Sequence, residues 1–332
     1  MSLPHGNISI FVPHIGCPHQ CSFCNQVHIT GQTEKPHSDA VCQAVETALC
    51  SKKYNPDFTE IAFFGGSFTA IDHEYRLELL KAAYKYVKSG AVAGIRVSTR
   101  PDAIDEDILR ELKSYGVTAI ELGAQSMNDD VLRFNNRGHT KEDVIKASRL
   151  IKDYGFSLGL QMMTGLFGDT EERSIETAKS IADLQPDTVR IYPTIVLEGT
   201  YLGKLYKAGE YAPQTLDEAV KLCGKIIPIF ESEGIKIIRL GLHAIEEDSY
   251  LAGPWHPAFG ELVECEKYKK ITLEKLSLLP RGKYILYVND REVSKLTGQR
   301  KTNLESFKSA GYDCKVKPSQ NLSKYQIQIE PY

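Results

Sequence analysis

HIGCPHQCSFCN, residues 14–25, carries three cysteines, Cys17, Cys21 and Cys24, in a Cys-x3-Cys-x2-Cys spacing. Three thiolates in one short loop can hold three irons of a [4Fe–4S] cube. Most cluster proteins supply four cysteines. Because this loop supplies only three, the fourth iron of such a cube is left open to a small molecule. The spacing therefore indicates chemistry at a free iron rather than simple electron storage.

Structural zinc is the main alternative for this loop, because His14, His19 and His28 flank the cysteines. Zinc sites usually draw their ligands from two separated pairs, and the sequence has no second pair. The remaining cysteines stand singly at positions 42, 50, 223, 265 and 314. A disulfide framework is also disfavoured, because the start of the chain shows no secretory pattern. The spacing favours the iron–sulfur cluster.

Length and composition predict an ordinary globular protein. The 332 residues can bury a full core and suit one large domain with an appendage, or two domains. The chain is 42% hydrophobic and 25% charged, and no apolar run reaches the roughly 18 residues that a membrane helix needs. We therefore expect a cytoplasmic protein without a membrane partner, in a reducing compartment that suits an oxygen-sensitive cluster.

The net charge of −3 hides an asymmetry along the chain. From residue 265 to residue 332, 11 Lys and 3 Arg stand against 7 Asp and Glu, which is a charge of +7. The rest of the chain then carries −10. Such a basic tail could contact the phosphates of a nucleic acid. A lysine-rich face in contact with solvent is the alternative, and the sequence leaves both open.

Seven short apolar runs alternate with amphipathic helical stretches. We expect strands at residues 8–12, 61–64, 94–97, 117–122, 156–162, 189–192 and 235–240. We expect helices between them at residues 38–50, 73–88, 105–115, 141–153, 171–184 and 216–233. Six or seven β-α units in a row predict an α/β fold, with a parallel sheet curled into a partial (β/α)6-type TIM barrel.

The sequence changes character from about Gly241 onward. Residues 253–257, GPWHP, indicate a rigid turn or linker. Strand patterns at residues 284–288 and 325–329, with a polar helix near residues 301–308, predict a small α+β extension. We therefore expect two domains, with residues 1–245 in the partial barrel and residues 246–332 in the extension.

Glycine or polar side chains follow the strands of the predicted barrel. The second strand is followed by Gly65, Gly66 and Ser67, and later strands end near Ser98, Glu121, Gln161 and Tyr192. Active sites of barrels of this type lie at the carboxyl ends of the strands. We therefore expect these residues and the cysteine loop to share one rim.

Five further motifs follow the cysteine loop in order: GGSFT at 65–69, STRPD at 98–102, ELGAQS at 121–126, NRGHT at 136–140 and RIYPTIVLEGT at 190–200. Together with the loop and its Phe23, they resemble the radical S-adenosylmethionine (SAM) superfamily. Within it they resemble the catalytic subunit of Elongator, a family that modifies the wobble uridine of tRNA. The resemblance covers roughly residues 7–240. It implies that an electron from the cluster cleaves SAM to a 5′-deoxyadenosyl radical.

The resemblance also implies roles for individual residues. The three cysteines would ligate the [4Fe–4S] cluster, with the methionine moiety of SAM on the open iron. Phe23 would lie at the adenine, Gly65 and Gly66 at the methionyl end, and Gln125, Arg137 and Gln161 in the SAM groove. The remaining candidate cofactor-binding residues are Ser67, Ser98 and Glu121. A guanidinium suits the SAM carboxylate, and amides suit ribose hydroxyls. No catalytic acid or base is assigned.

Two features depart from the Elongator pattern. That branch usually has Glu where this chain has Ser98, so a carboxylate that could hold SAM is missing there unless Glu121 substitutes for it. The 68 residues from Cys265 onward are too few for the acetyltransferase-like domain of Elongator, since such a fold needs well over about 100 residues. The N-terminal tRNA-binding extension is also missing from the pattern. We therefore expect that this chain does not perform the full carboxymethylation alone.

Three functions stay open on the sequence alone. The leading hypothesis is a radical SAM enzyme for RNA, with tRNA bound through the basic C-terminal residues and an external electron donor of the flavodoxin or ferredoxin type. The second hypothesis keeps this chemistry but places a small metabolite or cofactor precursor in the site. The third, less consistent with the ordered motifs, is a non-enzymatic iron–sulfur or zinc scaffold.

Overall fold

The computed structural model describes residues 6–13, 20–24, 35–242 and 247–332. These residues form two compact units, and each unit is described by itself. The first unit contains the described residues up to Gln214 together with Ile229–Pro254, and the second contains Thr215–Pro228 and Trp255–Tyr332. The domain boundary that the sequence suggests after residue 245 stays a prediction.

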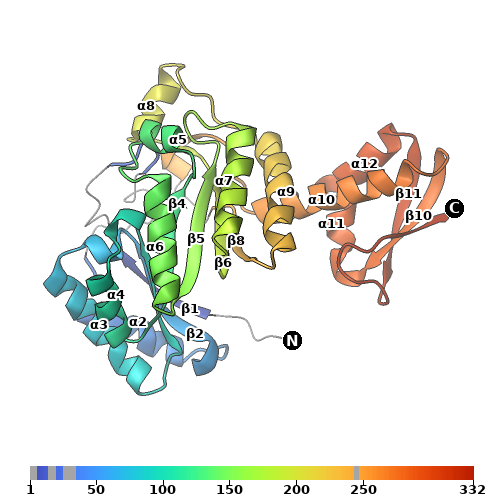
Figure 1. Ribbon diagram of the computed structural model, residues 1–332. Helices are drawn as coiled ribbons and strands as arrows, with labels where there is room; N and C mark the ends of the chain where they lie inside the picture. Colours follow the sequence, from blue (N-terminus) through green and yellow to red (C-terminus); the bar gives the residue numbers. More distant parts are fainter. Residues whose placement is uncertain (1–5, 14–19, 25–34, 243–246) are drawn as a thin grey trace. The chain divides into compact units, whose positions relative to one another are not determined.

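Seven strands form one parallel sheet in the first unit (Figure 1). They are β1 (Gly6–Val12), β2 (Thr59–Gly65), β3 (Gly94–Thr99), β4 (Val117–Gln125), β5 (Ser157–Thr164), β6 (Thr188–Pro193) and β8 (Lys236–Leu240). Their order in the sheet follows the sequence, and every neighbouring pair is parallel. The sheet curls into a half-barrel, which confirms the predicted partial TIM barrel.

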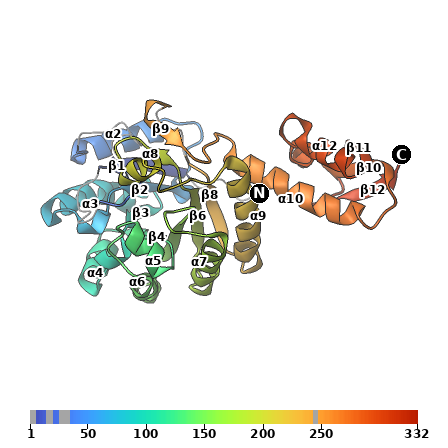
Figure 2. The same cartoon turned by 90° about the horizontal axis from the view of Figure 1, so that it is seen from above.

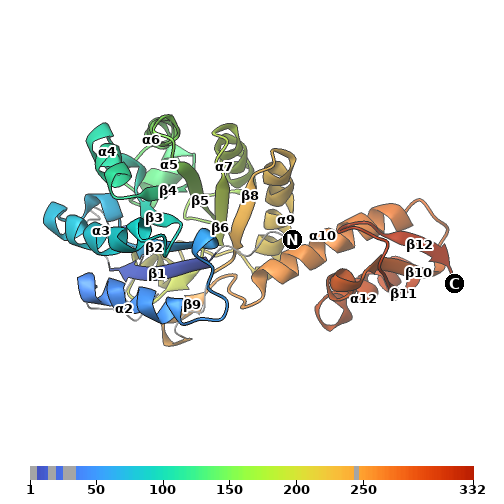
Figure 3. The same ribbon diagram turned by 90° about the horizontal axis from the view of Figure 1, so that it is seen from below.

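Helices connect successive strands, as the sequence predicts. They are α2 (Ser38–Leu49), α3 (His73–Lys88), α4 (Glu106–Ser114), α6 (Lys141–Asp153), α7 (Glu171–Asp183) and α9 (Leu216–Ser232). Seen from above and from below, α2, α3, α4, α6 and α7 lie outside the curved row of strands (Figures 2 and 3). The side chains of Asp105 and Thr140 cap the starts of α4 and α6. Of the helices that the structure describes, none is both long and apolar enough to cross a bilayer.

Shorter elements that the sequence did not predict follow several of the strands. Helix α5 (Asp129–Phe134) follows β4, and helix α8 (Tyr201–Lys207) follows β6 and β7 (Val196–Leu197). Strand β7 pairs in antiparallel fashion with β9 (Tyr250–Ala252). Single 3-10 turns are η1 (Pro56–Phe58), η2 (Phe68–Ala70), η3 (Pro101–Ala103), η4 (Glu247–Ser249), η5 (Asp290–Glu292) and η6 (Gln299–Lys301). Most of the elements that belong to the first unit build the loops around the rim.

The two faces of the seven-stranded sheet differ in chemistry. Side chains alternate between the faces of a strand, so Ile61 and Ile120, both fully buried, point toward the helices. Their sequence neighbours Glu60 and Glu121, with Arg96 on the strand between them, point to the opposite, inner face. The inner face is therefore polar although it is buried, and it surrounds the site.

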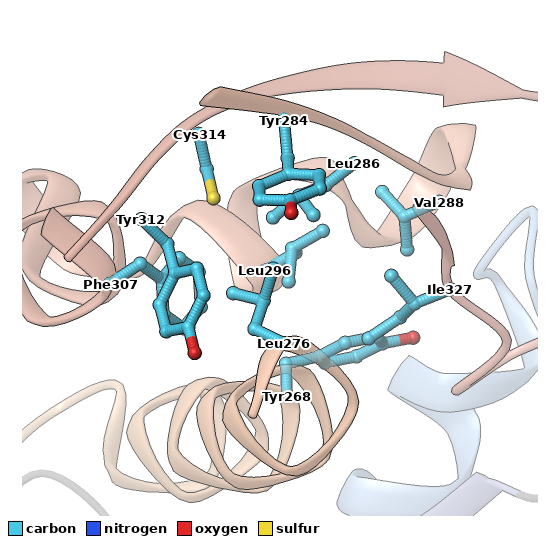
Figure 4. Close-up of a cluster of buried hydrophobic side chains, with 10 residues drawn as sticks. All are labelled: Tyr268, Leu276, Tyr284, Leu286, Val288, Leu296, Phe307, Tyr312, Cys314 and Ile327. Carbon is cyan, nitrogen blue, oxygen red and sulfur yellow. The ribbon is translucent and has the colours of Figure 1, made fainter. Parts of the chain in front are cut away.

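The second unit is a small α+β fold, as predicted. Its sheet has the order β11-β10-β12, formed by β10 (Gly282–Asn289), β11 (Tyr312–Ser319) and β12 (Gln328–Pro331). Its helices are α10 (Phe259–Leu276), α11 (Val293–Thr297) and α12 (Thr302–Ser309). Figure 4 shows how Leu286 and Val288 of the sheet point toward Tyr268 and Leu276 of α10 in one apolar cluster.

The predicted details of this unit need two corrections. The strand expected at 325–329 begins only at Gln328, because Tyr325 takes a left-handed conformation with φ of 64° that interrupts extended backbone. The strand Tyr312–Ser319 was not predicted at all. Charged residues alternate with apolar ones along it, so no continuous apolar run marks it in the sequence, although Tyr312 and Cys314 are buried on one face.

Removing one core side chain of the second unit should destabilise it measurably. Leu286 is fully buried in the cluster of Figure 4, so we expect Leu286→Ala to lower the free energy of unfolding by about 2–5 kcal/mol. The only tryptophan, Trp255, belongs to this unit, and its fluorescence during urea unfolding reports the change. Leu278→Ala is the matched control, because Leu278 is 85% exposed. Equal midpoints for the two variants would contradict the proposed core.

Candidate active site

The cysteine loop follows β1, and the structure places two of its three cysteines. Cys21 is buried and Cys24 is half-buried. The backbone N–H of Cys24 donates to the carbonyl oxygen of Cys21 at 3.1 Å, which closes a tight turn between them. Cys17 and the flanking residues His14, His19 and His28 lie outside the described residues. The predicted trio is therefore placed only in part, and its role as a ligand set stays a prediction.

Asn135 and Asn136 form hydrogen bonds with this loop. The backbone N–H of Ser22 donates to the Asn135 carbonyl oxygen at 3.1 Å, and its Oγ donates to Asn135 Oδ1 at 2.6 Å. Asn136 Nδ2 donates to the carbonyl oxygen of Gln20 at 3.0 Å. From the other side, the backbone N–H of Leu202 donates to the Ser22 carbonyl oxygen at 2.7 Å. Sequence reasoning missed Asn135, although it directly precedes the NRGHT motif.

Arg137 contacts both the cysteine loop and the end of β4. Its Nη1 lies 3.1 Å from Cys21 Sγ, and its Nη2 donates to the Gly123 carbonyl oxygen at 2.6 Å. The third nitrogen, Nε, is buried and has no partner among the described residues. The sequence predicts a contact with the SAM carboxylate, whereas the structure points this side chain at a predicted cluster ligand.

The glycine pair after β2 meets the end of β1. The backbone N–H of Gly66 donates to the carbonyl oxygen of Val12 at 2.8 Å. Gly65 has φ of +111°, and a Cβ there would lie 2.4 Å from that same oxygen and 2.6 Å from the ring of Phe11. Only glycine fits this close approach. The glycine pair thus joins the end of β2 to Val12, the last residue of β1, which leads into the cysteine loop.

Ser67 is placed beside the site but its side chain is already engaged. Its Oγ lies 2.8 Å from Thr99 Oγ1, and the backbone N–H of Arg100 donates to it at 3.2 Å. Thr69 extends this chain of hydrogen bonds, because its Oγ1 contacts Thr99 Oγ1 at 2.5 Å. Ser67 thus ties the loop after β2 to the end of β3, and its predicted contact with SAM stays a prediction.

A network of charged side chains crosses the inner face from β2 to β6. Arg96 donates to Glu60 at 2.9 Å and to Glu121 at 3.4 Å. Arg190 donates to both carboxylate oxygens of Glu121, at 2.7 and 3.0 Å. Gln161 Nε2 adds a further donor to Glu121 at 3.0 Å. The structure therefore brings the predicted residues Glu121 and Gln161 together, with Glu121 only 1% exposed.

The environment of Glu121 explains why two buried charges are tolerated there. Burial alone would lower the pKa of Arg190, but its hydrogen bonds to Glu121 and the carboxylate charge outweigh burial and raise that pKa. Gly159 leaves the space that the pair needs, because a Cβ at this position would lie 2.8 Å from Glu121 Cγ. Both oxygens of Glu121 thus have donors from the chain itself, and its predicted contact with SAM stays a prediction.

Several buried polar atoms near the carboxyl ends of the strands have no hydrogen-bond partner among the described residues. They are Ser98 Oγ near the end of β3, Gln125 Oε1 at the end of β4, Thr164 Oγ1 at the end of β5, Thr194 Oγ1 after β6, and Arg137 Nε. Buried polar groups are nearly always paired in proteins. These donors and acceptors therefore fit a polar ligand at the rim, and Ser98 and Gln125 were predicted there.

Phe23 lies half-buried against an apolar cluster. Its ring packs against the cluster of Val196, Leu202, Leu205 and Tyr211. Beside the same loop a hollow of about 410 Å³ opens, lined by Gln20, Ser22, Phe134, Asn136, Gly199, Tyr201 and Lys204. The predicted contact between the Phe23 backbone and adenine stays a prediction. The hollow gives solvent access to the loop next to Cys21.

His139 lies behind Arg137 as a buried, neutral imidazole. Its Nε2 lies 3.2 Å from the Ala124 carbonyl oxygen, which fixes the proton on Nε2, and its Nδ1 has no partner among the described residues. Burial, with the nearby charge of Arg137, lowers the pKa of His139 to about 4. The imidazole therefore supports β4 and does not add a second positive charge beside the cysteine loop.

Comparison with known proteins places this geometry in a family. A family model described as the radical SAM superfamily matches residues 11–181, more than half of the chain. The chain belongs to the radical SAM superfamily. A second model, described as the radical SAM C-terminal domain, matches residues 186–270. The chain is therefore a radical SAM enzyme, and the family implies a [4Fe–4S] cluster and SAM as cofactors.

Relatives of this radical SAM chain confirm the resemblance to the Elongator branch. The tRNA uridine(34) acetyltransferase of Dehalococcoides mccartyi is 27% identical over 62% of this chain and 52% of its own length. Human Elongator complex protein 3 is 32% identical over 53% of this chain and 36% of its own length. The solved structure of archaeal Methanocaldococcus infernus Elp3, with an N-terminal deletion, covers 84% of this chain and 66% of its own at 25% identity, with a TM-score of 0.65. The chain thus spans about half or less of these curated relatives.

The burial of His139 should make stability depend on pH. The unfolded imidazole has a pKa near 6.5 and the folded one near 4, so between these values the unfolded state binds more protons. The contribution of His139 to the free energy of unfolding should be fully present above pH 6.5. The free energy of unfolding should then fall by about 3 kcal/mol as the pH drops to 4. We expect His139→Gln, which keeps the donor to Ala124, to show a flatter decline in urea unfolding between these pH values. An unchanged decline would contradict the neutral, buried imidazole.

Proposed function

We propose that this radical SAM enzyme holds a [4Fe–4S] cluster on Cys17, Cys21 and Cys24 and binds SAM at the carboxyl ends of β2 to β5. Family membership supports this proposal, and so does the short loop that carries Cys21 and Cys24. When bound, the cluster would supply the electron that cleaves SAM into methionine and a 5′-deoxyadenosyl radical. The residues of the chain hold, orient and shield these partners.

The polar atoms at the rim suit SAM as a ligand. SAM offers a carboxylate, an ammonium group, ribose hydroxyls and adenine nitrogens. The unpaired donor Arg137 Nε and the unpaired acceptors of Gln125 and Ser98 match groups of this kind. Gly65 and Gly66 bring backbone without side chains to the same rim, which lets the methionyl end approach closely. We assign the remaining contacts as predicted, to Phe23, Ser67, Glu121 and Gln161.

Arg137 has two candidate partners in this site, the cluster and SAM. Its position 3.1 Å from Cys21 Sγ supports a charge-assisted hydrogen bond to the thiolate. Hydrogen bonds to cluster sulfurs are one of the factors that set the reduction potential. A guanidinium there would stabilise the more negative, reduced cluster and raise its potential. The free Nε can still meet the SAM carboxylate, so the two contacts are compatible.

The substrate that best fits these observations is a tRNA. The relatives are named for tRNA uridine(34) and for Elongator, and the chain ends in residues whose charge is +7 from residue 265 onward. Phosphates are bound by such lysine-rich surfaces. We propose that an external electron donor of the flavodoxin or ferredoxin type reduces the cluster.

Loss of one cysteine should abolish the cofactor chemistry. We expect anaerobically purified protein to contain about four irons and four sulfides per chain and to release 5′-deoxyadenosine from SAM upon reduction with dithionite. Cys21→Ala should lose the cluster signal and this release. Cys50→Ala is the matched control, because Cys50 is exposed and single. Protein that holds a cluster but never releases 5′-deoxyadenosine would refute the proposed chemistry.

The same variant tests the RNA substrate in cells. Nucleosides from digested tRNA of a deletion strain should lack one modified species that the wild-type gene restores. Cys21→Ala should fail to restore it, whereas Cys50→Ala should succeed. Identical nucleosides with and without the protein would argue for a small metabolite as the substrate instead.

Substitutions of Arg137 separate its two candidate partners. If it stabilises the reduced cluster, Arg137→Lys and Arg137→Gln should lower the midpoint potential of the SAM-free cluster, and Gln should lower it further because it also removes the charge. Lys204→Gln is the control, because Lys204 is an exposed cation beside the same loop. The potential is measured by spectroscopic titration. A weaker affinity for SAM with an unchanged potential would assign Arg137 to the SAM carboxylate alone.

A further inference from the structure

The sheet of the second unit has one covered face and one open face. Tyr284, Leu286 and Val288 of β10 are buried against the helices, and Figure 4 shows them in the apolar cluster. The side chains between them therefore point away from that cluster. We call this other side the open face, and the residues on it that carry the argument are Lys283, Ile285, Tyr287, Lys315, Lys317 and Tyr332.

Three lysines are brought together on the open face by strand pairing. In the parallel register of β10 and β11, Ile285 is paired with Lys315 and Tyr287 with Lys317. Lys283 precedes Ile285 by two residues and so lies on the same face. All three lysines are exposed. Asp313 is paired with Lys283 on this face, but Lys315 and Lys317 follow one another on the same side of β11 without an acidic residue between them on that side. Like charges at this spacing repel unless an anion neutralises them.

These lysines lack the carboxylate partners that other lysines of the unit have. Lys269, Lys295 and Lys324 form ion pairs with Glu266, Glu292 and Glu264. Among the described residues, no ion pair joins Lys283, Lys315 or Lys317 to a carboxylate. The acidic residues of this face are Asp313 and Glu330, and Glu330 accepts a hydrogen bond from Gln328 at 2.8 Å. Asp313 is paired with Lys283, whereas Lys315 and Lys317 are paired with the uncharged Ile285 and Tyr287. Lys315 and Lys317 are therefore the lysines available to an external anion.

Two tyrosines stand among the lysines. Tyr332 is 61% exposed, and Lys315 Nζ lies 4.1 Å from its ring centre and donates to its hydroxyl at 2.5 Å. That hydrogen bond from Lys315 lowers the pKa of Tyr332, and the charges of Lys283 and Lys317 act in the same direction. Lys315 thus lies directly against this exposed ring. Tyr287 offers a second ring at the centre of the sheet, between Lys317 and Gln328.

We propose that the open face binds RNA, with Tyr287 and Tyr332 stacking on unpaired bases and the three lysines contacting phosphates. Tyr332 is exposed and Tyr287 is half-buried on this face. Aromatic rings on a sheet, flanked by cations, are the arrangement that binds single-stranded nucleic acid. An acidic protein would be attracted by the same lysines, but the flat tyrosine rings between them favour bases. This inference rests on the RNA substrate proposed above and assigns its binding to one surface.

The test is binding of a fluorescently labelled tRNA transcript to the full-length protein at several salt concentrations. The double variant Lys315→Glu with Lys317→Glu should bind at least tenfold more weakly at low salt. The slope of log affinity against log salt should fall by about 1.5, because each lost phosphate contact removes about 0.7–0.9. Lys308→Glu is the matched control, since Lys308 is an exposed lysine on α12, which packs against the covered face. It should change affinity less than about twofold.

Stacking is tested separately from charge. Tyr287→Ala should weaken binding about 5- to 100-fold without changing the salt slope, and Tyr287→Phe should restore it. The proposal is overturned if the double variant binds like wild type, or if Lys308→Glu loses as much affinity as the double variant. It is also overturned if only reduction by flavodoxin is lost, which would assign the face to an electron carrier. Failure of the wild-type protein to bind tRNA would instead refute the RNA substrate itself.

Discussion

The hydrogen bonds between residues 135–137 and the cysteine loop are the constraint on which the site depends. A short loop loses conformational entropy when it is fixed, and contacts with neighbouring segments must compensate for that loss. Asn135 supplies backbone and side-chain partners to Ser22, and Arg137 reaches Cys21 from the end of β4. The loop that follows the first strand is thereby positioned by residues that follow the fourth.

The inner face of the barrel adds a second constraint, because it is polar and yet buried. Glu121 accepts from Arg190, Arg96 and Gln161, so its charge is compensated inside the protein. Loss of one partner from such a pair leaves a buried charge uncompensated, which typically costs about 3–5 kcal/mol. The network thus fixes the relative position of neighbouring strands at the depth where the ligand would lie.

The barrel was predictable from the sequence, whereas the partners within the site were not. Strands and helices alternate with strong periodicity, so their order and ends followed from apolar runs and caps such as Thr140. The strand Tyr312–Ser319 escaped prediction because only one of its faces is buried. Asn135 escaped because its importance lies in contacts with a distant loop. Ser67 shows the same limit, since its position was foreseen but its bond to Thr99 depends on how two strand ends meet.

The meeting point of β1 and β2 has a consequence for protein engineering. The carbonyl of Val12 both accepts the N–H of Gly66 and excludes any side chain at Gly65. The cysteine motif and the glycine motif are therefore parts of one module, although about 40 residues separate them in the sequence. A graft that transplants the first motif into a new scaffold must carry the second with it.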